Sequence, residues 1–249
     1  MGIVITVTSG KGGTGKTSIC GGIAASLALM GRSVLCIDMD IGLRNLDISL
    51  GLNDRALMDF SDVALGRCPL VRAAVTHPEL SGLSLLTSPM SIPKNMTEDS
   101  ILSLLDTART MYDYIIIDSP AGLGPGFHLA ICGADRVFVV STNDTSSLRD
   151  AQRTVLQLSH IPQVHLIMNR IQPQLLRRLR TTIDDAMNAA GLPLIGVVPE
   201  DVHVMLCANQ GLPLTSRGHR GAAAACWNIA QRLEGIQVPV MRIRKYGFF

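Results

Sequence analysis

Residues 10–17 read Gly-Lys-Gly-Gly-Thr-Gly-Lys-Thr, between the apolar run Ile3–Val7 and the Ala- and Leu-rich stretch Thr17–Leu29. The pattern fits G-x-x-x-x-G-K-[ST], which is typical of phosphate-binding loops. Glycines let the backbone approach a phosphate closely, and the helix that follows adds the positive end of its dipole. A glycine-rich turn without a ligand is the alternative, but the order strand, loop, helix favours nucleotide binding.

Further apolar runs follow along the chain and predict buried strands. They are rich in Val, Ile and Leu and are continuous rather than alternating, as in strands covered on both faces. These runs are Val34–Ile37, Leu83–Leu86, Tyr114–Ile117, Val137–Val140, Val164–Met168 and Leu194–Val198.

Stretches of helical character separate the runs, such as Glu98–Met111 and Ser146–Leu158, for which we expect Ser146 as the N-terminal cap. Alternating strands and helices predict an α/β, doubly wound, mostly parallel sheet of about seven to eight strands flanked by helices. We expect one P-loop ATPase domain over residues 1–235 and a C-terminal tail over residues 236–249.

Composition excludes several other classes of protein. The chain has 249 residues, 47% of them hydrophobic, and a formal net charge of +2, which excludes a disordered chain and gives no support for a strongly basic nucleic-acid binder. Its six cysteines include no C-x-x-C pair, which argues against a zinc site or a disulfide scaffold. With no signal peptide or membrane-spanning run in sight, we expect a cytoplasmic protein.

Polar residues follow five of the predicted strands. Ligands of such sheets bind at the carboxyl ends of the strands, so these residues are expected to converge on one site. They are the loop at residues 10–17, Asp38 and Asp40, Asp118, Asn169, and the turn that contains Pro199 and Asp201.

The phosphate loop assigns the first roles. Lys16 is expected to reach the β and γ phosphates, and Thr17 to bind Mg²⁺ through its hydroxyl. Asp118 ends an apolar strand, where an unpaired carboxylate is costly unless a hydrated Mg²⁺ lies nearby. The expected cofactors are therefore ATP and Mg²⁺, with nucleotide contacts from Gly10, Lys11, Gly12, Gly13, Thr14, Gly15, Lys16 and Thr17.

The distribution of lysines narrows the class of nucleotide-binding protein further. Only four of the 22 basic residues are lysines, and two of them, Lys11 and Lys16, lie in this one loop. An ordinary phosphate loop does not need Lys11, and with it the loop resembles the deviant Walker A ATPases of the ParA/MinD family. Residues 38–47 (DMDIGLRNLD), 118–122 (DSPAG), 199–201 (PED) and 208–211 (ANQG) are also similar to that family, closest to its MinD branch. The resemblance extends from residue 2 to about residue 235 and implies a P-loop NTPase fold of the SIMIBI type.

The resemblance implies further roles. Family members form a homodimer around ATP, in which the residue matching Lys11 reaches the phosphates of the partner subunit. Lys11, Lys16 and Asp40 would then be catalytic, with Asp40 orienting the attacking water. Asp38 would support Mg²⁺ through water, and its alternative role is to cap the loop.

Resemblance also suggests how the base is held. Asn169 and the backbone around Pro199 and Asp201 would hold adenine, and ordinary turn formation is the alternative. Asn45 would contact the nucleotide or the dimer partner.

The function implied is an ATP-dependent dimerisation switch with slow, Mg²⁺-dependent hydrolysis that regulates division-site placement at the membrane. Partners would include regulators like MinC and MinE. The alternatives are a DNA-partitioning ATPase of ParA type and a flagellar-number regulator of the same superfamily.

Two segments bear on membrane and DNA contact. The tail mixes three basic residues with apolar and aromatic ones over Val238–Phe249, which suits peripheral binding to the inner face of the cell membrane. Arg177, Arg178 and Arg180 form a second basic patch, suited to nonspecific DNA contact or to a solvated helix face.

Overall fold

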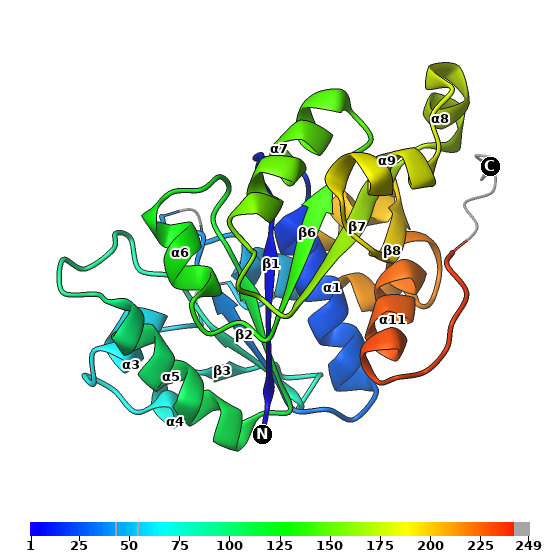
Figure 1. Ribbon diagram of the computed structural model, residues 1–249. Helices are drawn as coiled ribbons and strands as arrows, with labels where there is room; N and C mark the ends of the chain where they lie inside the picture. The colour runs from blue at the N-terminus through cyan, green and yellow to red at the C-terminus, as the bar shows by residue number, and fades with distance from the viewer. Residues whose placement is uncertain (43, 54, 242–249) are drawn as a thin grey trace.

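Strand β1 (Ile3–Thr8) lies inside an eight-stranded sheet with the order β3-β4-β2-β5-β1-β6-β7-β8. A computed structural model describes residues 1–42, 44–53 and 55–241, without the side chain of Arg217. All neighbouring strands pair in parallel except β3 and β4. The predicted α/β fold is therefore confirmed, and Figure 1 shows helices packed on both faces of the sheet.

The elements alternate along nearly the whole chain. The remaining strands are β2 (Val34–Asp38), β3 (Val75–Thr76), β4 (Leu83–Leu86), β5 (Tyr114–Asp118), β6 (Arg136–Ser141), β7 (Gln163–Ile171) and β8 (Leu194–Pro199). The helices are α1 (Lys16–Leu29), α2 (Leu46–Leu50), α3 (Phe60–Ala64), α4 (Leu70–Ala73), α5 (Glu98–Met111), α6 (Pro125–Ile131), α7 (Thr145–Leu156), α8 (Pro173–Leu179), α9 (Ile183–Ala190), α10 (Val202–Asn209), the 3₁₀ turn η1 (Leu214–Arg217) and α11 (Gly221–Leu233).

Both faces of the sheet are buried, which explains why the strands read as continuous apolar runs. In β5, Ile116 points into the core with α1 and α11, while Ile115 and Ile117 point into the core with α5. A third core joins α6, α7 and α9 to the half of the sheet that contains β6 and β7. Successive strand residues thus point to opposite faces of the sheet, so Asp118, the residue after Ile117, lies on the α1 face.

All seven predicted strands are present, and most extend a residue or more beyond their apolar cores. The sequence reading missed β3, because two residues, Val75 and Thr76, are too few to show a pattern; they pair antiparallel with Leu85 and Ser84. The expected cap Ser146 was wrong. Asp144 caps α7 instead, since its side chain accepts a hydrogen bond from the backbone N–H of Ser147.

The end of the chain leaves the sheet after α11. Residues 236–241 form neither helix nor strand, and residues 242–249, which carry most of the predicted membrane-contacting tail, lie outside the described residues. In the part of the chain that the structure describes, no helix is both long and apolar enough to cross a membrane.

Helices α1 and α11 pack so closely that Gly22 has no room for a side chain. A Cβ at Gly22 would lie 2.6 Å from Sγ and 3.2 Å from Cβ of Cys226. We expect Gly22→Ala to lower the free energy of unfolding by about 1–3 kcal/mol, although alanine normally stabilises a helix interior. Urea unfolding of the variant measures this change.

A double-mutant cycle provides the control. Cys226→Ala removes the clashing sulfur, so Gly22→Ala should cost much less in that background than in the native chain. Equal costs in the two backgrounds would contradict the packing argument.

Candidate nucleotide-binding site

Glycines shape the loop between β1 and α1. Gly13 and Gly15 adopt φ angles of 80° and 89°, which favour glycine. Gly15 is the residue before α1, so the first N–H groups of that helix open into the loop. Lys16 begins the helix and is only 6% exposed. This buried cation at a helix N-terminus gives the loop the charge that an anion requires.

Neighbouring elements hold the loop from both sides. A Cβ at Gly10 would lie 2.4 Å from the carbonyl oxygen of Asp150 in α7, so only glycine allows this approach. On the other side Asn169, at the end of β7, donates from Nδ2 to the carbonyl oxygen of Thr14 at 2.7 Å. Asn169 is therefore next to the loop, where its first contact is with the protein backbone.

Arg170 is a further contact that the sequence reading missed. It lies at an irregularity between β7 and β8 and takes a φ of 56°, unusual for a side chain other than glycine. Its guanidinium donates to the carbonyl oxygen of Gly13 at 3.3 Å and pairs with Glu200 at 2.8 Å. Arg170 follows Asn169 in the sequence, and Glu200 precedes Asp201. Both residues come directly after predicted strands, and this position could have identified them as site residues.

Two carboxylates meet under the loop. Asp38 and Asp118 are paired neighbours on the parallel strands β2 and β5. Strand alternation sends both side chains to the α1 face, where Thr17 and Lys16 begin the helix. The predicted convergence of strand ends is thus confirmed for these residues.

The two carboxylates differ in their partners. Asp38 accepts hydrogen bonds from the backbone N–H groups of Asp40 at 2.9 Å and Leu46 at 3.2 Å, so it caps the loop after β2. Both carboxylate oxygens of Asp118 are buried and lack a hydrogen-bond partner within the described residues. A buried carboxylate without partners is costly, and this one is open to a bound cation.

Burial governs the ionisation of this group of acids. Desolvation raises the pKa of Asp118 to about 7, although the nearby Thr17 hydroxyl and Lys16 oppose the rise. Desolvation also raises the pKa of Asp38 to about 6, against the two backbone hydrogen bonds. Burial raises the pKa of Asp40, and Lys16 only partly opposes this rise. The ionised acids therefore need additional positive charge.

A hydrated magnesium ion fits this arrangement. Mg²⁺ usually keeps several waters and takes only one or two protein carboxylates. Within residues 1–42, 44–53 and 55–241, no three His, Cys, Asp or Glu side chains form a metal-binding group. The site offers the Asp118 carboxylate close to the Thr17 hydroxyl, which suits an ion held mainly by water and phosphate.

Lys11 lies on the opposite side of the loop from Lys16. Its side chain is 45% exposed, and its ammonium donates to Ser146 at 2.8 Å and lies 3.4 Å from Asp144. Partial burial opposes ionisation of Asp144, but hydrogen bonds from Ser146, Thr142 and the Ser147 N–H outweigh it, so its pKa is lowered. Lys11 thus contacts the start of α7, whereas Lys16 lies with Asp118 at the start of α1.

The remaining predicted residues lie at the rim. Asp201 caps α10 through the His203 N–H at 2.9 Å and also accepts from the Ala222 N–H at 2.9 Å. Its carboxylate therefore serves two helix starts, and only its backbone could face a base. Pro199 ends β8, and Asn45 is an exposed residue just before α2.

The site combines a strand, a glycine-rich loop, a buried lysine and an acidic residue at the end of a second strand. These features together define a P-loop nucleotide-binding domain. A family model described as the CobQ/CobB/MinD/ParA nucleotide-binding domain matches residues 5–214, and the chain belongs to this family of P-loop ATPases.

Its relatives include septum site-determining proteins. The chain is 39% identical to "Septum site-determining protein MinD" of Helicobacter pylori over 100% of this chain and 97% of that one. Its structure is similar to MinD in the MinC:MinD complex of Aquifex aeolicus, with a TM-score of 0.89, 34% identity and coverage of 98% and 100%. It is also similar to MinD of Pyrococcus horikoshii bound to Mg-ADP, with a TM-score of 0.81, 26% identity and coverage of 94% and 96%.

The buried Asp118 predicts a pH dependence of the unliganded protein. The unfolded chain ionises this group near pH 4, whereas the folded protein does so near pH 7. The stability that the neutral form provides is complete below about pH 4 and is lost as the pH rises through about 7. We expect Asp118→Asn to lose less stability than the native chain between about pH 5 and 8 in urea unfolding without Mg²⁺.

Asp106→Asn, on the exposed side of α5, is the matched control and should leave the pH profile unchanged. An Asp118→Asn profile that overlays the native one would show that burial does not perturb this carboxylate.

Proposed function

We propose that the protein is an ATP-dependent dimerisation switch of MinD type, with slow Mg²⁺-dependent hydrolysis, that regulates division-site placement at the membrane. The opposite placement of the two loop lysines carries this proposal. Lys16 is buried among the acids of its own site, whereas Lys11 is half-exposed and directed outward. An outward cation beside a phosphate loop is suited to the phosphates of a second subunit.

ATP binding follows from the loop. Backbone N–H groups of residues 10–17 and the Lys16 ammonium would hold the β and γ phosphates. Thr17 and Asp118 would hold Mg²⁺, which when bound would neutralise phosphate charge. Asp38 would act on the same site indirectly, since its two backbone hydrogen bonds fix the segment that carries Asp40.

Hydrolysis would depend on Asp40 and on Lys11. Asp40 lies after β2, where its carboxylate would orient the attacking water toward the γ phosphate. Lys11 would leave Asp144 and Ser146 and reach the partner's nucleotide, so that charge stabilisation is complete only in the dimer. The contact that it leaves is exposed and therefore costs little to break.

Base recognition would fall to residues that follow β7 and β8. Asn169 and the backbone around Pro199 and Asp201 would hold adenine, with Asn169 fixed by its hydrogen bond to Thr14. Asn45 would contact the nucleotide or the partner subunit from the start of α2.

The names of the relatives support a role in division-site selection. Proteins similar over the full chain are septum site-determining proteins, and one similar structure is a MinC:MinD complex. We propose a MinC-like regulator, a MinE-like activator and peripheral membrane contact through the C-terminal tail. The exposed Arg177 and Arg178 favour DNA contact by a ParA-type protein as the second candidate.

Replacing Lys16 and replacing Lys11 should impair different steps. We expect Lys16→Ala to lose ATP binding, because the buried charge at the phosphates is removed. Lys11→Ala should still bind ATP but should remain monomeric and hydrolyse ATP no faster than Lys16→Ala. Nucleotide titration, light scattering and phosphate release measure the three steps.

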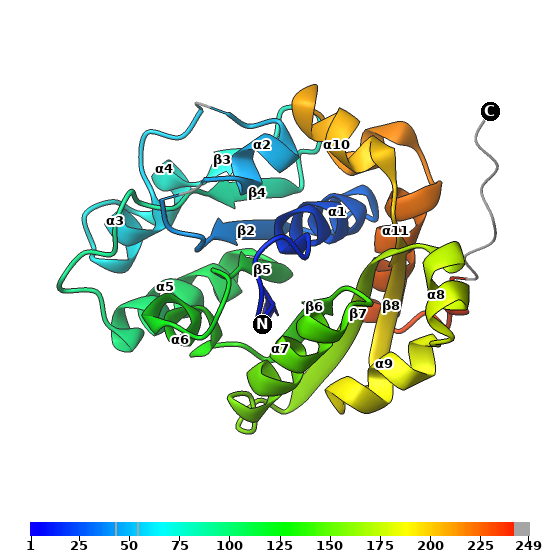
Figure 2. The same ribbon diagram turned by 90° about the horizontal axis from the view of Figure 1, so that it is seen from above.

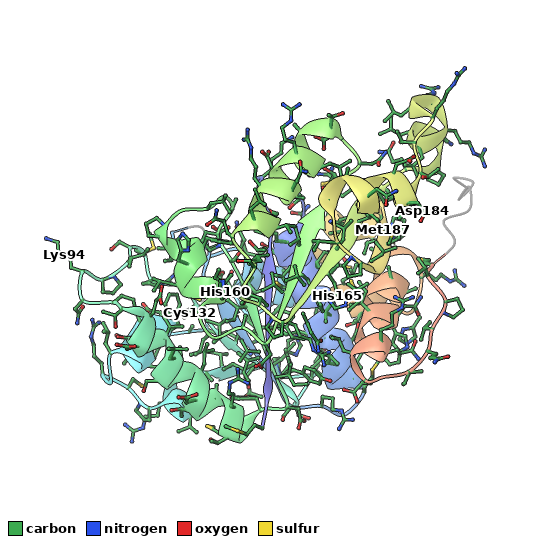
Figure 3. All side chains as sticks on the ribbon, in the orientation of Figure 1. Lys94, Cys132, His160, His165, Asp184 and Met187 are labelled. Atoms are coloured by element: carbon green, nitrogen blue, oxygen red, sulfur yellow. The ribbon has the colours of Figure 1, made fainter. Side chains whose placement is uncertain are left out.

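Lys94→Ala is the control, because Lys94 lies on a loop away from the site, as Figure 3 shows. If Lys11→Ala dimerised and hydrolysed ATP normally, the role of Lys11 across the dimer would be wrong.

Vesicle sedimentation tests the membrane step. We expect the full chain to pellet with anionic vesicles in ATP but not in ADP, and a chain cut after Gln237 to stay in the supernatant. Retention of the ATP-bound protein on duplex DNA, lost as salt rises, would instead favour the ParA-type candidate.

A further inference from the structure

Helix α8 is unusually exposed for a short helix that contains three leucines. None of its residues is buried, and Leu175 and Leu179 are 44% and 51% exposed. Their spacing of four residues puts both side chains on one side of the helix. Figures 1 and 2 show α8 projecting from the body near the β8 edge of the sheet. Leucines in this position are available to a partner with an apolar interior.

The same helix is strongly basic. Arg177, Arg178 and Arg180 are all exposed, and residues 172–180 contain no Asp or Glu. Of the ion pairs formed by described residues, none involves these three arginines. Basic groups without acidic neighbours suit a partner with many negative charges.

The combination of exposed leucines and arginines on α8 favours one kind of binding partner. A DNA backbone would bind the arginines but would leave Leu175 and Leu179 in water. An anionic bilayer offers phosphate to the guanidinium groups and hydrocarbon to the leucines. The mixture of side chains therefore fits lipid better than nucleic acid.

The C-terminal segment passes directly beside α8. Val240 and Met241 line a cavity of about 520 Å³ together with Pro173 and Leu176 of α8. Arg232 fixes this path, because its guanidinium donates to the carbonyl oxygens of Val238 at 3.0 Å and Pro239 at 2.7 Å. The tail that we propose for membrane contact thus passes beside Pro173 and Leu176 of α8 at Val240 and Met241.

One acidic group near α8 lies on the side of the cavity. Asp184 of α9 lines the same cavity, and Figure 3 labels it with Met187 beside the C-terminal segment. Asp185 hydrogen-bonds Thr182, which caps α9. Leu175 and Leu179 do not line the cavity, so an approaching lipid surface would meet them outside it.

We propose that α8 is a second lipid-contacting element, in which Leu175 and Leu179 enter the interface of an anionic bilayer while Arg177, Arg178 and Arg180 contact its phosphate headgroups. This inference rests on the proposed membrane contact of the tail and adds a surface on the folded domain. A patch of two leucines binds weakly alone, so two copies in the ATP-bound dimer would strengthen it.

Vesicle sedimentation of full-length variants with ATP tests the proposal. We expect Arg177→Gln/Arg178→Gln to weaken binding to anionic vesicles by about 25-fold, from about fivefold for each arginine. Leu175→Ser/Leu179→Ser should weaken it similarly, while solution dimerisation and ATP binding stay unchanged because α8 lies outside the nucleotide site.

The control is a similar pair near the opposite edge of the sheet, where Figure 2 shows α4 beside β3. Val71 of α4 is 67% exposed and is followed by the exposed Arg72, so Val71→Ser/Arg72→Gln should bind vesicles as the native chain does. If the α8 variants bind as this control does, the α8 proposal is wrong while the tail keeps its role. If the native chain binds no vesicle, the membrane contacts of both tail and α8 are wrong.

A fluorescent probe reports insertion directly. We expect Leu179→Trp to be quenched by brominated lipid in anionic vesicles, and Leu156→Trp, at a 72% exposed position of α7, to be unquenched. Quenching of neither variant on bound protein would overturn the proposal. Retention of the protein on duplex DNA would also overturn the proposal if Arg177→Gln/Arg178→Gln abolished that retention and Leu175→Ser/Leu179→Ser left it intact.

Discussion

The burial of negative charge at the ends of β2 and β5 is the constraint on which the site depends. Asp38 and Asp118 are paired neighbours in a sheet covered on both faces, and their desolvation raises both pKa values. Lys16 is the buried cation that offsets them in part. Among the described residues Asp118 has no hydrogen-bond partner, and burial of such a carboxylate lowers the stability of the domain.

Close contacts also hold the phosphate loop from both sides. Glycines at positions 10 and 15 admit the backbone of Asp150 and the amide of Asn169, and Arg170 reaches the carbonyl oxygen of Gly13. These contacts fix the loop from α7 and β7. A preorganised loop of this kind binds phosphate at a low cost in conformational entropy.

Much of this architecture follows from local patterns. The apolar runs predicted all seven main strands, and the residues after two of them, Asp38 and Asp118, are neighbours in the structure as predicted. Strand β3 could not be predicted, because two residues that pair antiparallel have no periodicity to detect. The cap of α7 was assigned to Ser146 instead of Asp144, since neighbouring polar residues compete for a cap and only backbone geometry decides between them.

The sequence by itself determined the fold class, the phosphate loop and the acids beneath it, because hydrophobic period and glycine spacing are local properties of the chain. Tertiary structure alone decided the rest. It placed Lys11 on Asp144 and Ser146, more than 130 residues away, and placed Arg170 between Gly13 and Glu200. It also brought α8 beside the C-terminal segment. Such contacts join strand ends and helix starts that meet only when the sheet has formed, so no local pattern encodes them.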